Sequence, residues 1–210
     1  KNSERRKTPG IYDSVTIGPI GKRVQFILLD TRYFRSPLKR AAKREKGKGP
    51  YGPNESDQAE ILGETQWKWL EKTLREPAEV RIIASSIQVV STTHGWETWG
   101  NFPKERKRFL DLLNKTKANG VIILSGDRHS SEISKLSGPL PSPLFDVTSS
   151  AMNQKQRPQA EENPHRLGER YFDENFGLLK INWTGSKPRI AMEVRDLNGQ
   201  VVRKAEVAFP

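Results

Sequence analysis

Short apolar runs alternate with amphipathic helical patterns through the middle of this chain, and that alternation limits the fold more than any other feature. Residues 24–29 and 80–90 are rich in β-branched side chains and predict two strands, the second interrupted near Ser85 and Ser86. Residues 121–124 predict a third strand, buried on both faces. Polar residues follow each run, so each predicted strand ends in a loop.

The segments between these strands have the residue spacing of helices. Residues 63–75 place large apolar side chains at intervals of three and four, and the pattern stops before Pro77. Residues 103–117 repeat this pattern, and Pro103 suits the first turn of a helix. Strands that alternate with helices predict an α/β fold in which the helices pack on a sheet.

The last third of the chain has a different pattern. Residues 176–183, 190–195 and 201–209 predict three further strands, joined by turns that contain Gly185 and the pair 198–199. That pair is Asn-Gly, a strong signal for a tight hairpin. We therefore expect residues 1–210 to form a single unit that closes with an antiparallel β meander.

The composition restricts the chemistry that the chain can carry out. It contains no cysteine, which excludes disulfides, thiolate metal sites and a cysteine nucleophile but leaves the compartment open. No stretch approaches the roughly 20 apolar residues that cross a bilayer, so we expect no transmembrane segment. The formal net charge of +11 favours polyanions, anionic surfaces or phosphorylated substrates as partners.

Basic residues crowd together in residues 35–58, which we expect to form a mobile loop. This segment is rich in glycine and proline, and it contains a dense group of basic side chains: Arg40, Lys43, Arg44, Lys46 and Lys48. Such a loop could attract phosphate or nucleic acid, or it could simply be a solvated surface excursion.

The strongest local motif follows the predicted strand 121–124. There the chain reads Ser-Gly-Asp-Arg-His-Ser, which places Asp127 and His129 two residues apart on a turn at a strand end. A carboxylate oxygen and an imidazole nitrogen in that position could bind one or two cations. The same side chains could also form hydrogen bonds only with the local backbone, and the sequence leaves both interpretations open.

Two other predicted strands also end in polar side chains. Asp30 and Arg32 follow residues 24–29, where they could form a salt bridge or meet an anionic ligand. His94 follows the second predicted strand, in a loop that could form a substrate rim or plug the end of the sheet. The sequence has no G-x-S-x-G elbow, phosphate-binding P-loop or H-E-x-x-H helix. By elimination, a metal site is the favoured chemistry.

Taken in order, these segments resemble the C-terminal half of PhoD-type alkaline phosphatases, within the calcineurin-like metallophosphoesterases. The resemblance covers nearly the whole chain, and it rests on the shared order of the segments 26–35, 62–70, 85–89, 99–103, 126–129 and 146–150. It implies a layered α-β-β-α sandwich, with metals at the sheet edge and a water or hydroxide that attacks a phosphate mono- or diester. Ca²⁺ and Fe³⁺ are the ions implied, and an extracytoplasmic location is implied as well.

The resemblance also implies roles for individual residues. His129 and Asp127 match the segment that carries the last metal ligands of the superfamily. We expect His94 to protonate the leaving oxygen and Arg32 to hold a non-bridging phosphate oxygen. Other motif positions near the cleft are expected to line the substrate site: Asp30, Gln88 and Asn101.

One departure from the family is serious, because the upstream segments that carry its other metal ligands are absent from this sequence. Two donors fall short of the four to six that such metals require. We therefore expect the chain to need a missing N-terminal half, in cis or in trans, and to be inactive alone. The alternatives are a non-catalytic module that binds polyanions or nucleic acid through the basic loop, or a purely structural fragment.

Overall fold

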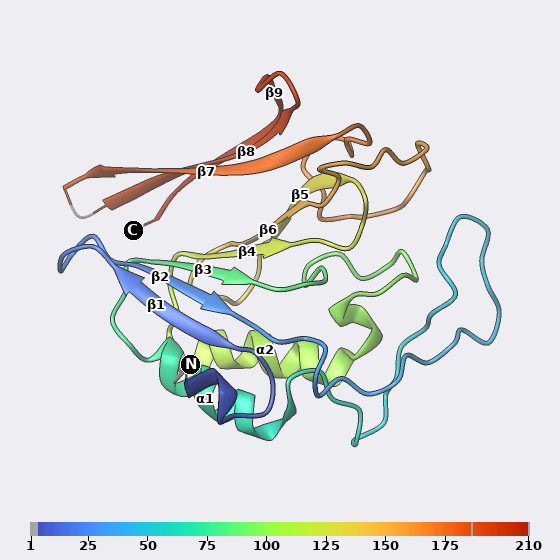
Figure 1. The fold of residues 1–210 in the computed structure, drawn as a ribbon, viewed down its shortest axis with the longest axis horizontal. Coiled ribbons are helices and arrows are strands. Elements are labelled where there is room, and N and C mark those ends of the chain that lie inside the picture. Colours follow the sequence, from blue (N-terminus) through green and yellow to red (C-terminus); the bar gives the residue numbers. More distant parts are fainter. Residues whose placement is uncertain (1–3, 186, 210) are drawn as a thin grey trace.

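The computed structural model describes residues 4–185 and 187–209, and it arranges them in three layers (Figure 1). Helices α1 (Gly63–Leu74) and α2 (Pro103–Thr116) cover one face of a six-stranded sheet. A separate three-stranded sheet lies against the other face. The predicted α/β class, with helices packed on a sheet, is therefore confirmed.

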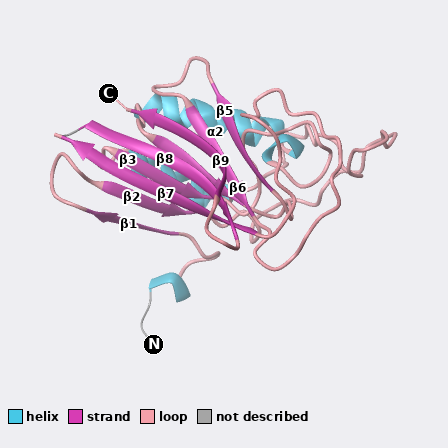
Figure 2. Cartoon of the chain, turned by 90° about the horizontal axis from the view of Figure 1, so that it is seen from above, coloured by secondary structure: helices cyan, strands magenta, loops and turns pink. Residues whose placement is uncertain are grey.

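The six-stranded sheet has the order β1-β2-β3-β4-β6-β5. Its four inner strands run parallel, and both edge strands run antiparallel to their neighbours. The strands are β1 (Asp13–Ile17), β2 (Val24–Leu28), β3 (Val80–Ala84), β4 (Val121–Ser125), β5 (Ser131–Leu136) and β6 (Leu144–Ser149). Because the inner strands are parallel, their carboxyl ends meet at one edge, where the long loops gather (Figure 2).

The helix layer encloses the larger part of the core. Ile83 and Ile123 extend from the sheet towards Trp67 and Phe109 on the two helices, and all four side chains are buried. The Trp99 ring, from the short 3-10 helix Trp99–Asn101, packs against the Phe109 ring with centroids 5.2 Å apart. The apolar spacing that predicted the helices is therefore their buried face.

The three-stranded sheet is the antiparallel meander that the sequence predicts. It consists of β7 (Asn175–Thr184), β8 (Lys187–Asp196) and β9 (Val201–Ala208), in that order. Ile190, Met192 and Val194 of β8 form its buried face and join a core cluster with Ile82 and Ile122. The predicted turn between the first two of these strands includes residue 186, which lies outside the described residues.

The structure also differs from the sequence-based prediction in three strands. β1, β5 and β6 were not predicted, because β1 is short and exposed and β5 reads Ser-Glu-Ile-Ser-Lys-Leu, without a continuous apolar run. The basic loop 35–58 is a loop as predicted, with an isolated bridge between Arg40 and Tyr51. A second outer helix layer, as in the implied four-layer sandwich, is not among the described residues.

No helix within the described ranges is both long and apolar enough to cross a bilayer.

A buried carboxylate connects the two helices near the carboxyl ends of the strands. Glu105, in the first turn of α2, accepts hydrogen bonds from Ile61 N–H at 2.7 Å and Leu62 N–H at 3.3 Å. The indole Nε1–H of Trp67, on α1, donates to both of its oxygens at 3.0 Å. One side chain thus satisfies three buried donors that would otherwise lack acceptors.

We predict that Glu105→Ala lowers the free energy of unfolding by about 2–4 kcal/mol, because it leaves three buried N–H groups unpaired. Urea denaturation at neutral pH measures the change. Glu64→Ala is the matched control, since that carboxylate makes only an exposed pair with Arg108 and should matter by about 0.5 kcal/mol or less. Equal losses in the two variants would contradict this account of Glu105.

Candidate functional site

The loop after β4 places the two predicted metal ligands at the carboxyl edge of the sheet. Asp127 and His129 are both exposed, whereas Arg128 between them is buried. Asp127 and His129 both adopt left-handed backbone conformations, with φ of 69° and 50°, which residues with a side chain rarely adopt. The anchoring of Arg128 therefore turns the flanking carboxylate and imidazole outward.

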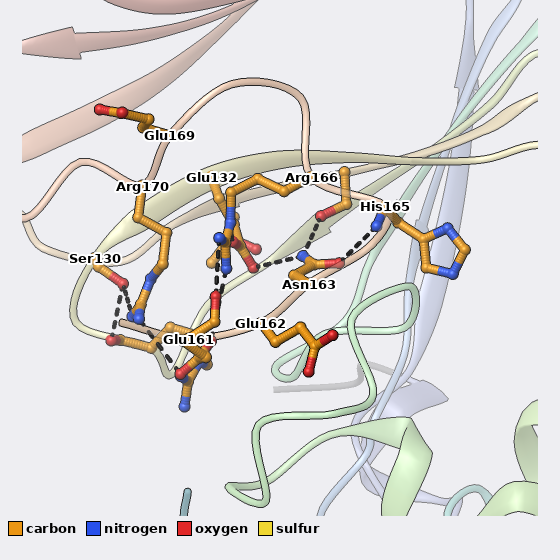
Figure 3. A network of polar contacts seen from close by, with 12 residues as sticks. Ser130, Glu132, Glu161, Glu162, Asn163, His165, Arg166, Glu169 and Arg170 are labelled. Atoms are coloured by element: carbon orange, nitrogen blue, oxygen red, sulfur yellow. Dashed lines mark hydrogen bonds and ion pairs between the residues drawn. The ribbon is translucent and has the colours of Figure 1, made fainter. Parts of the chain in front are cut away.

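Arg128 belongs to a buried network of arginines and glutamates. Figure 3 labels four of the other members: Glu132, Glu161, Arg166 and Arg170. The Arg128 guanidinium pairs with Glu161 at 2.5 Å, and Arg170 contacts the same carboxylate at 3.3 Å. Arg166 pairs with Glu132 of β5 and also donates to the Glu161 carbonyl oxygen at 3.0 Å. Three guanidinium groups thus surround two carboxylates, and all but Arg166 have side chains under 10% exposed.

Neutral side chains complete this network. Asn163 donates to Glu132 at 3.2 Å and to Ser134 at 2.9 Å, and Arg170 donates to Ser130 Oγ at 2.7 Å. The polar segment 154–174 is therefore fixed against β5 and the loop after β4. His165 is partly exposed, and its ring points away from the network in Figure 3.

A second charged cluster lies beside Asp127. Arg32 Nη2 approaches Asp127 Oδ1 at 3.5 Å, and both Arg32 and Arg35 pair with Glu97. The Asp127 side chain is 34% exposed, and this partial burial raises its pKa. Glu97 raises the pKa further, while Arg32, Arg128 and His129 partly offset the rise. The structure thus brings Arg32, Asp127 and Glu97 together from three separate loops.

His94 lies in the loop after β3, for which the sequence left open a substrate rim or a plug of the sheet end. Its side chain is fully buried, and Nδ1 accepts a hydrogen bond from Trp96 N–H at 3.0 Å. Burial lowers the pKa of His94 to about 2, and Arg128, Arg170 and Arg166 lower it as well. The lowered pKa keeps this imidazole neutral near pH 7, whereas the proton-donor role requires its protonated form. That role of His94 stays a prediction.

The three predicted substrate-lining residues make internal hydrogen bonds. Asp30 accepts hydrogen bonds from the N–H groups of Ile11, Arg32 and Tyr33 at 2.8–2.9 Å. Burial alone would raise the pKa of Asp30, but these three hydrogen bonds together outweigh burial and lower it. The buried Gln88 donates to Glu132 at 2.6 Å and to Thr148 at 2.8 Å.

Asn101 caps the short helix through its contact with Thr98 N–H at 2.9 Å. It also lines a cavity of about 210 Å³ beneath the basic loop, together with Lys43 and Lys48. Among the three predicted lining residues, only Asn101 thus lies beside one of the cavities described here. The Gln88 side-chain nitrogen donates within the buried network, whereas its Oε1 has no hydrogen-bond partner among the described residues. The Asp30 carboxylate holds its own loop in place.

The described residues fit only part of a metal site. Asp127 can supply carboxylate oxygen donors and His129 an imidazole nitrogen donor. Within residues 4–185 and 187–209, however, no group of three or more His, Asp, Glu or Cys side chains could hold an ion. A bound divalent or trivalent ion needs at least four donors. These residues could therefore contribute to a metal site but cannot complete one.

A further buried carboxylate was not among the predicted site residues. Asp146 of β6 accepts from Val89 N–H at 2.7 Å, from Val90 N–H at 2.9 Å and from Ser125 Oγ at 2.6 Å. It ties the loop after β3 to the end of β4. Burial raises the pKa of Asp146 to about 6, although these hydrogen bonds lower it. The only sequence signal was its place in the segment 146–150.

The fold and the site define a mixed α/β protein whose charged side chains collect at the carboxyl ends of parallel strands. A model of the PhoD-like phosphatase family matches residues 2–175. The chain therefore belongs to the PhoD-like phosphatase family.

Two relatives place this assignment in context. Alkaline phosphatase D of Bacillus subtilis (strain 168) is 26% identical over 125 residues, which cover 55% of this chain and 21% of that protein. A solved structure titled "Structure of PhoD" aligns with a TM-score of 0.63 and 21% identity, covering 93% of this chain and 40% of that chain. The chain thus spans less than half the length of either relative.

We predict that Asp146 makes stability fall as pH rises from about 4 to about 6. Its raised pKa means that the folded state binds the proton more tightly than the unfolded state, so the stabilisation is present at pH 4 and lost above pH 6. Comparison with Asp146→Asn isolates this contribution, which should be on the order of 2 kcal/mol. Denaturant titrations at several pH values measure it, and a constant difference between the two proteins from pH 4 to 7 would refute it.

Proposed function

We propose that this chain is the part of a metal-dependent phosphoesterase that contributes Asp127 and His129 as metal ligands. The observation that carries the proposal is the loop after β4, in which buried Arg128 holds two exposed donors on the strand edge. Membership of the PhoD-like phosphatase family supports hydrolysis of a phosphate ester as the reaction. The substrate class is a phosphate mono- or diester.

The roles of the side chains follow from their chemistry. A carboxylate suits hard ions such as Ca²⁺, and imidazole with carboxylate suits iron, so both ions remain in the proposal. A bound ion would lower the pKa of a water molecule and so supply the attacking hydroxide. Arg32, 3.5 Å from Asp127, is placed to hold a phosphate oxygen beside that ion, provided that the phosphate competes with Glu97.

We further propose that additional polypeptide, in cis or in trans, supplies the remaining ligands. Two donors do not complete a coordination sphere, and the chain covers only 21% and 40% of the two relatives. The chain alone should therefore lack activity. An extracytoplasmic location remains an expectation from the family resemblance.

The direct test measures hydrolysis of p-nitrophenyl phosphate and bis-p-nitrophenyl phosphate by the intact protein. We predict that chelation abolishes turnover, and that Asp127→Asn and His129→Gln each lower kcat/KM about 100-fold or more, because each removes a donor from the metal. His165→Gln is the matched control and should keep wild-type activity. Full activity in both ligand variants, or in residues 1–210 alone, would contradict the proposal.

A non-catalytic role in polyanion binding is the second candidate. It is favoured by the exposed basic side chains of the loop 35–58, whose Arg44 lies over the Trp96 ring at 5.9 Å. This role predicts single-strand oligonucleotide binding that weakens steeply with salt and is lost when Arg40, Lys43 and Lys46 are replaced by glutamine. Fluorescence anisotropy at 50 and 200 mM salt measures it. Phosphatase activity should not change in this triple variant.

A further inference from the structure

The face of the six-stranded sheet opposite the helices is apolar even where nothing covers it. The pairing register places Val15, Phe26, Ile82, Ile122 and Phe145 in one row across β1, β2, β3, β4 and β6. All five side chains are apolar and lie on the same side of the sheet, since residues paired across neighbouring strands point the same way.

Exposure along this row drops sharply between β2 and β3. Val15 and Phe26 are 56% and 41% exposed, whereas Ile82, Ile122 and Phe145 are 0–3% exposed. The neighbouring row shows the same trend, from Leu28 at 43% to Val147 at 3%. The β7–β9 sheet therefore covers the β3–β6 part of this face and leaves the β1–β2 part open to solvent.

A strand with one face in water normally alternates apolar and polar side chains, and β2 does not. Val24, Phe26 and Leu28 point to the side of the second sheet, where Val24 is buried but Phe26 and Leu28 are exposed, and Ile27 points into the helix-side core. A strand with apolar residues on both sides is typical of one that is buried on both sides. The sequence of β2 is thus suited to a cover that the described residues do not provide.

The open face continues into two cavities that share Phe26, Ile82 and Leu124. One has a volume of about 300 Å³ and lies over β1, β2 and β3; the other has a volume of about 630 Å³ and is bounded by β7. Five consecutive residues of β7, 175–179, line the larger cavity. Consecutive residues of a strand point to opposite faces, so it is the edge of β7 that borders this space.

That edge of β7 is available for pairing. Within the described residues β7 pairs as a strand only with β8, and Asn175 N–H donates to Ala151 O at 2.9 Å just where β7 begins. An edge strand presents a row of free N–H and C=O groups to any chain that lies beside it. An apolar floor next to a free strand edge forms a receptor for an extended segment.

We propose that further polypeptide of the same protein adds at least one strand to the free edge of β7. That strand continues the second sheet across β2 and β1, and its inward side chains bury Phe26, Leu28 and Val15. The added strand belongs to the additional polypeptide of the proposed function, so this inference rests on that proposal and names its docking surface. The length of the structural relative, of which this chain covers 40%, leaves ample chain for such a segment.

The test uses the absence of cysteine from this chain, which makes an introduced thiol its only one. Phe26→Cys and Leu28→Cys are made in residues 1–210 and in the intact protein, whose mass is measured. N-ethylmaleimide labelling is followed by peptide mapping. The control is Lys68→Cys, exposed on α1 in the helix layer on the opposite face.

We expect both sheet positions to label in residues 1–210 at rates close to the control, and at least about tenfold more slowly in the intact protein. Equal labelling in the two proteins, or an intact protein of only 210 residues, overturns the proposal. Protection that appears in residues 1–210 alone and grows with concentration identifies a second copy instead, and this also overturns it.

Hydrogen exchange provides a second readout that needs no substitution. The β7 amides that point away from β8 should exchange freely in residues 1–210 and be protected in the intact protein. Neither readout requires activity, so a protein without phosphatase turnover could still pass this test. Conversely, an active protein with an unprotected β7 edge would refute the docking surface alone.

Discussion

The buried pairing of Arg128 with Glu161 is the interaction on which the strand-edge site depends. Guanidinium and carboxylate groups are costly to bury unless each meets an opposite charge, and here three arginines share two glutamates drawn from separate segments. Removing either partner would leave an uncompensated charge in the interior. The pairing therefore locks the loop after β4 to the segment 154–174 and keeps Asp127 and His129 facing outward.

Buried carboxylates hold the other strand-edge loops by a similar principle. Asp146 and Glu105 each accept backbone N–H groups from segments that have no regular partner, at distances of 2.7–3.3 Å. Loops fixed in this way lose little conformational entropy when a ligand binds. The edge is thus organised in advance for Arg32 and Asp127, which approach each other from different loops.

The sequence predicted the parts of the fold that local patterns control. Both helices and the apolar strands β2, β3 and β4 follow from periodicity within a dozen residues. β5 could not be predicted this way, because its buried Glu132 is stabilised by Arg166 and Gln88, which lie 34 and 44 residues away in the chain. The same limit explains His94: its strand-end position was visible in the sequence, but the burial that chiefly lowers its pKa, and the three arginines that lower it further, depend on distant segments.

The additional polypeptide proposed above would meet two needs, the incomplete donor set and the uncovered apolar face. The larger cavity is lined by Ser125, Ser149 and Ser150 at the carboxyl ends of β4 and β6, directly before the loop that bears Asp127. A strand added to β7 over this cavity would therefore run past the strand edge where ligands are lacking. One segment could thus both cover the apolar face and supply the lacking metal donors. Burial of its apolar side chains would position those donors, so the metal site would form only when the second sheet is complete.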